Sequence, residues 1–197
     1  LLKQGGNAFD ASIASASTLA GVEPHGSGLG GGGFWLIYQA KSKKYIFIDA
    51  REASPIKLTE KMLLDEKGTP KKEDILNGVL GAGIPGEIAA FDYIAKHFAI
   101  QTPKEQLKYA IQAAKEGFPV TESLKKMISF RLNALQKSKE SSQLFLVNQA
   151  APELGHIIKQ PQLANTLSIL SGNGFHSFYQ KKSAEKLVAA LTNTGSV

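Results

Sequence analysis

The chain has 197 residues, of which 43% are hydrophobic and 20% are charged, and its formal net charge is +6. This composition is typical of a globular chain that buries a core, so one domain or a large piece of one is expected. The absence of cysteine excludes disulfides, thiolate metal sites and cysteine nucleophiles. The lysines form small scattered clusters, which argues against nucleic-acid binding, and no apolar run approaches the ~18 residues that a membrane span needs.

The first predicted element is a helix from Ala8 to about Ala20. Asn7 is a good N-cap, and Asp10 would lie in the first turn, where the positive end of the helix dipole favours an anion. Apolar residues recur at helical spacing through this segment, and small residues fill the positions between them. These small residues predict close packing against another element.

A glycine-rich loop follows this helix, with six glycines among the eight residues of Gly26–Gly33. A dinucleotide fingerprint needs a strand before its glycines and a helix after them. Here the order is reversed, because a helix precedes the loop and the strand-like run Phe34–Tyr38 follows it. The sequence therefore argues against a nucleotide site and predicts a loop whose backbone is approached closely by another group.

Two strands are predicted next, over residues 34–40 and 45–50, joined as a hairpin by a polar turn. The first strand is almost entirely apolar, which predicts that both of its faces are covered. Arg51 follows the second strand, and local sequence leaves two interpretations open. It is either a surface arginine paired with Asp49 or Glu52, or a rigidly held guanidinium that binds a carboxylate through two parallel hydrogen bonds.

The remainder of the chain is predicted to be mostly helical. The strongest local signal is Thr102–Glu105, a capping box with proline at the first helical position, which starts a helix that ends before Gly117. With two or three strands, the chain is predicted to be an α-rich α+β chain without an internal boundary. The predicted helical segments are 59–64, 87–98, 103–116, 122–137, 162–170 and 183–193, with a polar connection over 137–143.

Other kinds of chemistry find little support. No two of the four histidines have helical metal-ligand spacing, so neither a metal nor another cofactor is expected. A serine hydrolase built on Ser27, with His25 and Asp49 as helpers, would need glycine two residues before and after the serine, and neither is present. Glu23 and Glu87 could serve as acid and base, but carboxylates at such positions are more often caps or ion-pair partners.

Several blocks resemble the large chain of γ-glutamyltranspeptidases, and they occur in the same order along the whole sequence. The blocks that carry the resemblance are Gly5–Ala11, Glu23–Phe34, Asp49–Pro55, Gly83–Glu87, Ala113–Val120 and Gln160–Leu167. The resemblance implies part of the four-layer αββα sandwich of N-terminal nucleophile hydrolases. Residues 1–197 would then be an incomplete large-subunit portion of a single domain, lacking the natural start and the segment that leads to the processing site.

In this family one precursor cuts itself into two chains, and the new N-terminal threonine of the small chain is the nucleophile. The resemblance implies that this threonine lies in a Thr-Thr-His stretch. None of the eight threonines of this chain is followed by Thr-His. The nucleophile is therefore expected in the partner, the small-subunit half of the same precursor.

By the same resemblance, Arg51 corresponds to the arginine that holds the α-carboxylate of the γ-glutamyl group. Gly30, Gly31 and Gly32 would form a loop near the active centre without a catalytic side chain. The implied activity transfers the γ-glutamyl group of glutathione or related amides to water or amino acids, without a cofactor, in a periplasmic or secreted protein. Two alternatives remain, namely a related acylase acting on a β-lactam side chain or poly-γ-glutamate, and a non-catalytic binding module.

Overall fold

The computed structural model describes residues 1–193, and the chain divides into two compact units. Unit 1 comprises residues 1–28 and 92–174, and unit 2 comprises residues 29–91 with the chain from 175 onward. The expectation that residues 1–197 belong to one domain without an internal boundary stays a prediction.

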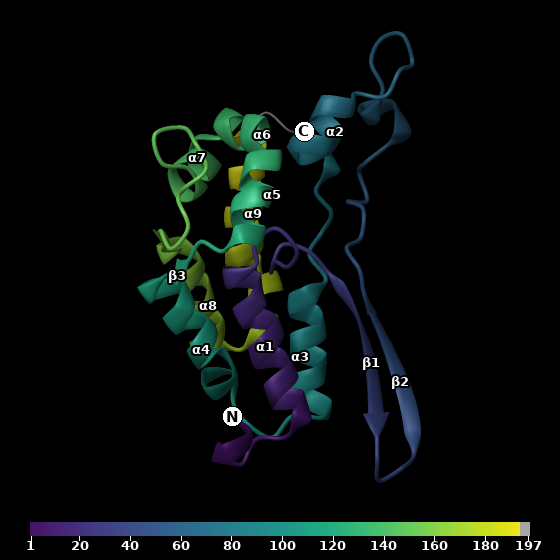
Figure 1. The fold of residues 1–197 in the computed structure, drawn as a ribbon. Coiled ribbons are helices and arrows are strands. Elements are labelled where there is room, and N and C mark those ends of the chain that lie inside the picture. The colour runs from purple at the N-terminus through teal and green to yellow at the C-terminus, as the bar shows by residue number, and fades with distance from the viewer. Residues whose placement is uncertain (194–197) are drawn as a thin grey trace. The chain divides into compact units, whose positions relative to one another are not determined.

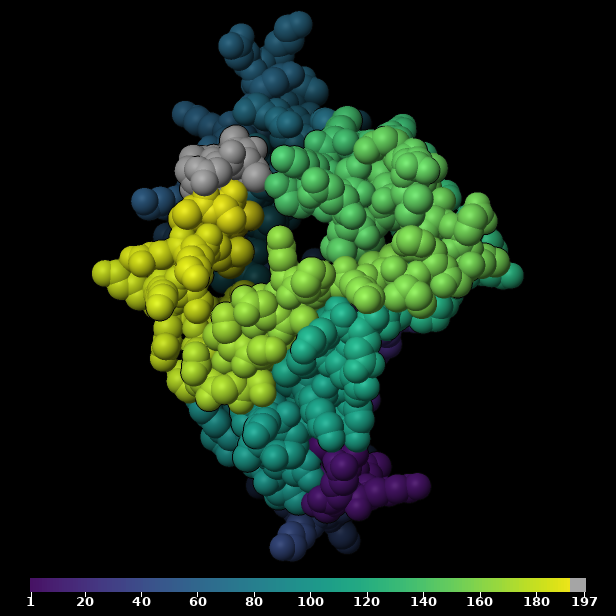
Figure 2. All heavy atoms as spheres, turned by 90° about the vertical axis from the view of Figure 1, so that its left-hand side faces the viewer, coloured from purple at the N-terminus to yellow at the C-terminus, as the bar shows by residue number. Residues whose placement is uncertain are grey.

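Unit 1 is built around the helices α1 (Ala8–Val22), α4 (Pro103–Glu116) and α8 (Pro161–Asn173). α4 packs against both α1 and α8, and Figure 2 shows the yellow-green atoms of α8 lying against the teal atoms of α4. Each helix contributes an almost completely buried side chain, namely Ile13 of α1, Leu107 of α4 and Leu167 of α8. The predicted helices over 8–20, 103–116 and 162–170 are thereby confirmed, with α1 and α8 slightly longer than expected.

Asp10 ties the start of α1 to the segment before α4. It completes a capping box with Asn7, and its carboxylate also accepts hydrogen bonds from Gln101 N at 3.0 Å and from Gln106 Nε2 at 2.8 Å. Burial alone would raise the pKa of this carboxyl. The hydrogen bonds from the Asn7 backbone, the Gln106 side chain and the Gln101 and Ile100 backbones outweigh burial, and the net pKa is lowered.

The remaining part of unit 1 differs from the predicted helix pattern. The single helix expected over 122–137 is broken at Arg131 into α5 (Glu122–Phe130) and α6 (Leu132–Lys137). The polar connection expected over 137–143 is wrong, because α7 (Lys139–Phe145) begins there, capped by the Ser138 side chain. Leu135 and Phe145 pack against the apolar cluster of α5, β3 (Phe118–Pro119) and β4 (Ile157–Ile158), so tertiary packing decides these elements.

Unit 2 contains the antiparallel hairpin β1 (Gly33–Gln39) and β2 (Lys44–Ala50), which Figure 1 shows as a long two-stranded ribbon. Trp35 lies on one face and meets the ring of Phe91 edge-on at 5.9 Å. The other face carries large apolar side chains that are 50–73% exposed: Phe34, Leu36, Tyr38, Tyr45 and Phe47. The expectation that both faces of the first strand are covered is therefore wrong within the residues that the structure describes.

The other elements of unit 2 are short, except for its last helix. Helix α3 (Glu87–His97) begins in this unit, and Phe91 of α3 also meets the ring of Phe175 at 5.6 Å. The 3-10 turn η2 confirms the helical piece expected near 59–64, whereas α2 was not predicted. The bounds are η2 Glu60–Leu63, α2 Lys72–Asn77, η3 Val79–Gly81, η4 Phe175–Tyr179 and α9 Lys181–Asn193, and unit 1 adds η1 Leu2–Gln4.

Candidate functional site

Arg51 stands directly after β2, whose last residue, Ala50, is buried. The Asp49 carboxylate accepts a hydrogen bond from the Arg51 backbone N–H at 3.0 Å, which fixes the turn out of the strand. The side chain of Arg51 is exposed, and no ion pair joins it to Asp49 or Glu52 in residues 1–193. The guanidinium is therefore available to an external carboxylate.

The backbone around Arg51 is approached closely by two glycines. A Cβ atom on Gly32 would lie 2.9 Å from Arg51 Cα, and one on Gly86 would lie 2.9 Å from Arg51 O. Both Cβ atoms would also overlap the carbonyl oxygen of Ala50. Only a residue without a side chain fits at either position. The glycine loop and the turn before α3 therefore pack against the end of β2 through backbone contacts.

Backbone hydrogen bonds hold these segments together. The carbonyl oxygen of Gly31 accepts from Gly86 N at 3.0 Å and from Glu87 N at 3.1 Å. Beyond Arg51, Ala53 and Ile84 exchange two backbone hydrogen bonds of 3.2 and 2.7 Å. The position of Arg51 is thus set by segments that lie far apart in sequence.

An open cavity of about 570 Å³ adjoins this arrangement. Its lining is mostly polar and includes Arg51, Gly30, Glu52 and the segment 81–83. A guanidinium in such a place can hold a carboxylate through two charge-assisted hydrogen bonds. The carboxylate of the neighbouring Glu52 would repel a further anionic group and attract a cationic one. A ligand with one carboxylate for Arg51 and one ammonium group for Glu52, such as an amino acid, therefore suits the site.

Glu87 opens α3 beside the glycine loop. Burial raises the pKa of its carboxyl, a hydrogen bond with Trp35 acts in the opposite direction, and the like charge of Glu52 adds to the rise. One oxygen of Glu87, Oε2, is buried and has no hydrogen-bond partner in the described part of the chain. Protonation of Glu87 is therefore easier than for an exposed glutamate.

A sequence profile described as Gamma-glutamyltranspeptidase matches residues 1–197, the whole length of the chain. The chain belongs to the γ-glutamyltranspeptidase family. A curated relative from Pseudomonas sp. (strain A14), named Glutathione hydrolase proenzyme, is 33% identical over 198 residues, which are 100% of this chain and 34% of that protein. This member of the γ-glutamyltranspeptidase family therefore spans about a third of the length of that relative.

Solved structures of the γ-glutamyltranspeptidase family show the same fold. The crystal structure of Helicobacter pylori γ-glutamyltranspeptidase matches 100% of this chain and 56% of its own with a TM-score of 0.93 at 29% identity. The γ-glutamyltranspeptidase of Pseudomonas nitroreducens, complexed with L-DON, matches 98% and 56% with a TM-score of 0.89 at 32% identity. The predicted α-rich α+β fold, as part of an N-terminal nucleophile hydrolase, is confirmed.

The structure brings the predicted site residues together, while their roles stay predictions. Gly30 lines the cavity of Arg51, Gly31 bonds to the start of α3, and Gly32 lies against Arg51 itself. Sequence reasoning missed the part played by Gly86. It lies in the Gly83–Glu87 block that carries the family resemblance, and the dipeptide Pro85-Gly86 was the only local signal.

No group of three or more metal-ligating side chains gathers within residues 1–193. None of the helices in this part of the chain is both long enough and apolar enough to span a bilayer.

Proposed function

We propose that this chain is the large-chain portion of a γ-glutamyltransferase or hydrolase, in which Arg51 holds the α-carboxylate of the γ-glutamyl donor. The observation that supports this proposal most directly is that Arg51 is exposed, has no ion pair among the described residues, directly follows β2 and lines an open cavity. Glutathione and related γ-glutamyl amides carry the carboxylate and the α-amino group that suit Arg51 and Glu52.

In the proposed reaction the nucleophile is a threonine supplied by the small-subunit half of the precursor. Its hydroxyl attacks the γ-carbonyl carbon, the amide C–N bond breaks, and the leaving amine takes a proton. Water or an amino acid then attacks the threonyl ester, releasing glutamate or a new γ-glutamyl amide and regenerating the hydroxyl. This chain contributes binding and orientation, which place the γ-carbonyl relative to the nucleophile.

The proposal includes a precursor and its export. Curated relatives are named proenzymes, which supports synthesis as one precursor that is later divided. A periplasmic or secreted location follows from the family resemblance. Expression of the complete gene, followed by intact mass and N-terminal sequencing, should yield two chains, of which the smaller begins with threonine. A single stable uncut chain would favour a binding module instead.

Arg51→Lys in the complete protein tests the anchor. Lysine keeps the charge but loses the two parallel hydrogen bonds, and a charge-assisted contact is worth about 1.5–3 kcal/mol. We expect KM for γ-glutamyl-p-nitroanilide to rise about 10- to 100-fold, since ~1.4 kcal/mol corresponds to tenfold. Arg131→Lys, the same change at the only other arginine of the chain, is the matched control and should leave KM unchanged.

A second donor makes this test specific for the carboxylate. The γ-aminobutyryl amide retains the amine and the reacting carbonyl but lacks the α-carboxylate. It should be a poor donor for the unaltered protein, and Arg51→Lys should change its kcat/KM very little. If Arg51→Lys leaves KM for the γ-glutamyl donor unchanged, Arg51 is not the anchor.

A further inference from the structure

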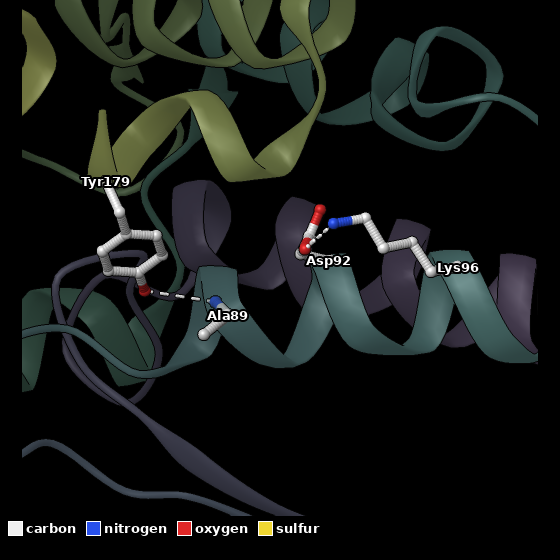
Figure 3. A network of polar contacts seen from close by, with 4 residues as sticks. All are labelled: Ala89, Asp92, Lys96 and Tyr179. Carbon is white, nitrogen blue, oxygen red and sulfur yellow. Dashed lines mark hydrogen bonds and ion pairs between the residues drawn. The ribbon is translucent and has the colours of Figure 1, made fainter. Parts of the chain in front are cut away.

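The hydroxyl of Tyr179 joins two points at the start of α3. It donates a hydrogen bond to the carbonyl oxygen of Pro85 at 2.7 Å and accepts one from the backbone N–H of Ala89 at 3.1 Å. Figure 3 shows the Tyr179 side chain reaching from η4 to Ala89, while the ion pair of Asp92 and Lys96 lies farther along the same helix. Tyr179 thereby closes the turn formed by residues 85–89.

This turn carries Gly86, whose backbone lies against Ala50 and Arg51. The N–H of Gly86 also donates to Gly31 O in the glycine loop. A displacement of the turn would therefore displace both the loop and the residue that follows β2. The Tyr179 hydroxyl thereby acts on Arg51 through the turn, to which both of its hydrogen bonds are made.

The Tyr179 hydroxyl also supplies the N-cap hydrogen bond of α3, which Gly86 cannot make because it has no side chain. The first N–H groups of a helix have no partner inside the helix, and side chains at the N-cap usually satisfy them. Asn7 and Thr102 do so for α1 and α4. Gly86 precedes α3 and accepts the first helical hydrogen bond from Ala90 N at 3.1 Å, but it has no side chain to serve as a cap.

The close approach to Arg51 requires glycine at position 86, so the cap must come from another segment. The segment η4 is suited to provide it, because Phe175 is buried and its ring contacts Phe91 of α3. We propose that Tyr179 is a positioning residue for Arg51, acting through the Pro85–Ala89 turn. This inference rests on the proposed function, since it concerns the same carboxylate anchor.

Tyr179→Phe in the complete two-chain protein tests the inference. It removes only the hydroxyl, so we expect KM for γ-glutamyl-p-nitroanilide to rise about 2- to 10-fold, the equivalent of one neutral hydrogen bond. The value of kcat should stay within about twofold, because uniform binding is lost and not transition-state stabilisation. Hydrogen exchange at the Ala89 amide should become faster. Tyr109→Phe is the control, because no hydrogen bond is recorded for the Tyr109 hydroxyl in the described residues, and KM should not change.

The double variant separates positioning from a general structural role. If Tyr179 acts through Arg51, Tyr179→Phe should raise KM by less than about twofold in the Arg51→Lys background, because coupled residues are not additive. Full additivity, or an unchanged KM in the single variant, would overturn the inference while leaving Arg51 as the anchor. An unchanged KM in Arg51→Lys alone would instead show that Arg51 is not the carboxylate anchor, and this inference would fall with that part of the proposed function.

Discussion

The glycine loop offers a direct test of whether its residues serve the structure or the site, using two substitutions two positions apart. A Cβ on Gly32 would lie 2.9 Å from both Arg51 Cα and Glu52 N, and these backbone atoms cannot turn aside as a flexible side chain could. A Cβ on Gly30 would meet nothing within 4 Å in the described part of the chain. Neither residue has a positive φ, so alanine is strained at neither position by the backbone itself.

We therefore expect Gly32→Ala to destabilise the complete protein by about 1–3 kcal/mol, the usual cost of overpacking. Gly30→Ala should change stability by less than about 0.5 kcal/mol. Thermal scans of both variants at one scan rate measure the difference, since the midpoint depends on scan rate when unfolding is irreversible. KM for the γ-glutamyl donor should also rise in Gly32→Ala, because the Arg51 backbone must move. Equal midpoints for the two variants would refute this reasoning.

The pKa shifts of two carboxyl groups predict that their contributions to folding stability change with pH in opposite directions. The Asp10 pKa is lowered, so the stability that Asp10 contributes is present above its ordinary value of 3.8 and is lost as pH falls through the lowered pKa. Asp10→Asn leaves two donors, which are partly or fully buried, facing an amide NH₂. The loss should lower the free energy of unfolding by about 2–6 kcal/mol at pH 7, at ~1–3 kcal/mol per donor, and a thermal midpoint unchanged at pH 7 would contradict this. The Glu87 pKa is raised, so stability is full below 4.5 and falls as pH rises through the raised pKa. Glu87→Gln should therefore raise the thermal midpoint at pH 7 and not below pH ~4, whereas a gain that is the same at both pH values would refute the assignment.

Elements with complete local signals were predicted well. The capping box of Thr102 and Glu105, with proline between them and Gly117 at the end, encodes both limits of α4 within the helix itself. The hairpin likewise follows from two apolar runs and a polar turn. By contrast, the local signal for α7 is limited to its cap, Ser138, and its Phe145 packs against a cluster built from residues 118–158, which no local pattern encodes.

The candidate site shows the same division between local and long-range signals. The dense glycines of the loop predicted a close backbone approach, but the identity of the approaching group, the end of β2, is set by long-range contacts. Arg51 could be singled out only with the family resemblance, since most single arginines are surface groups. Tyr179 had no signal at all, because its two hydrogen-bond partners lie 94 and 90 residues earlier in the chain.

The exposed apolar face of the β1–β2 hairpin indicates where the rest of the protein contacts this chain. A two-stranded hairpin is marginal alone, and large exposed apolar patches mark surfaces that other protein segments cover. The aromatic pairs Phe34–Phe47 and Tyr38–Tyr45 lie on this face, with ring centroids 5.7 and 4.9 Å apart. The chain spans only about a third of the length of its relative, 34%. We therefore expect the remaining segments of the proposed precursor to cover this face, so that the apolar pattern of β1, which predicted burial on both sides, is satisfied in the complete protein.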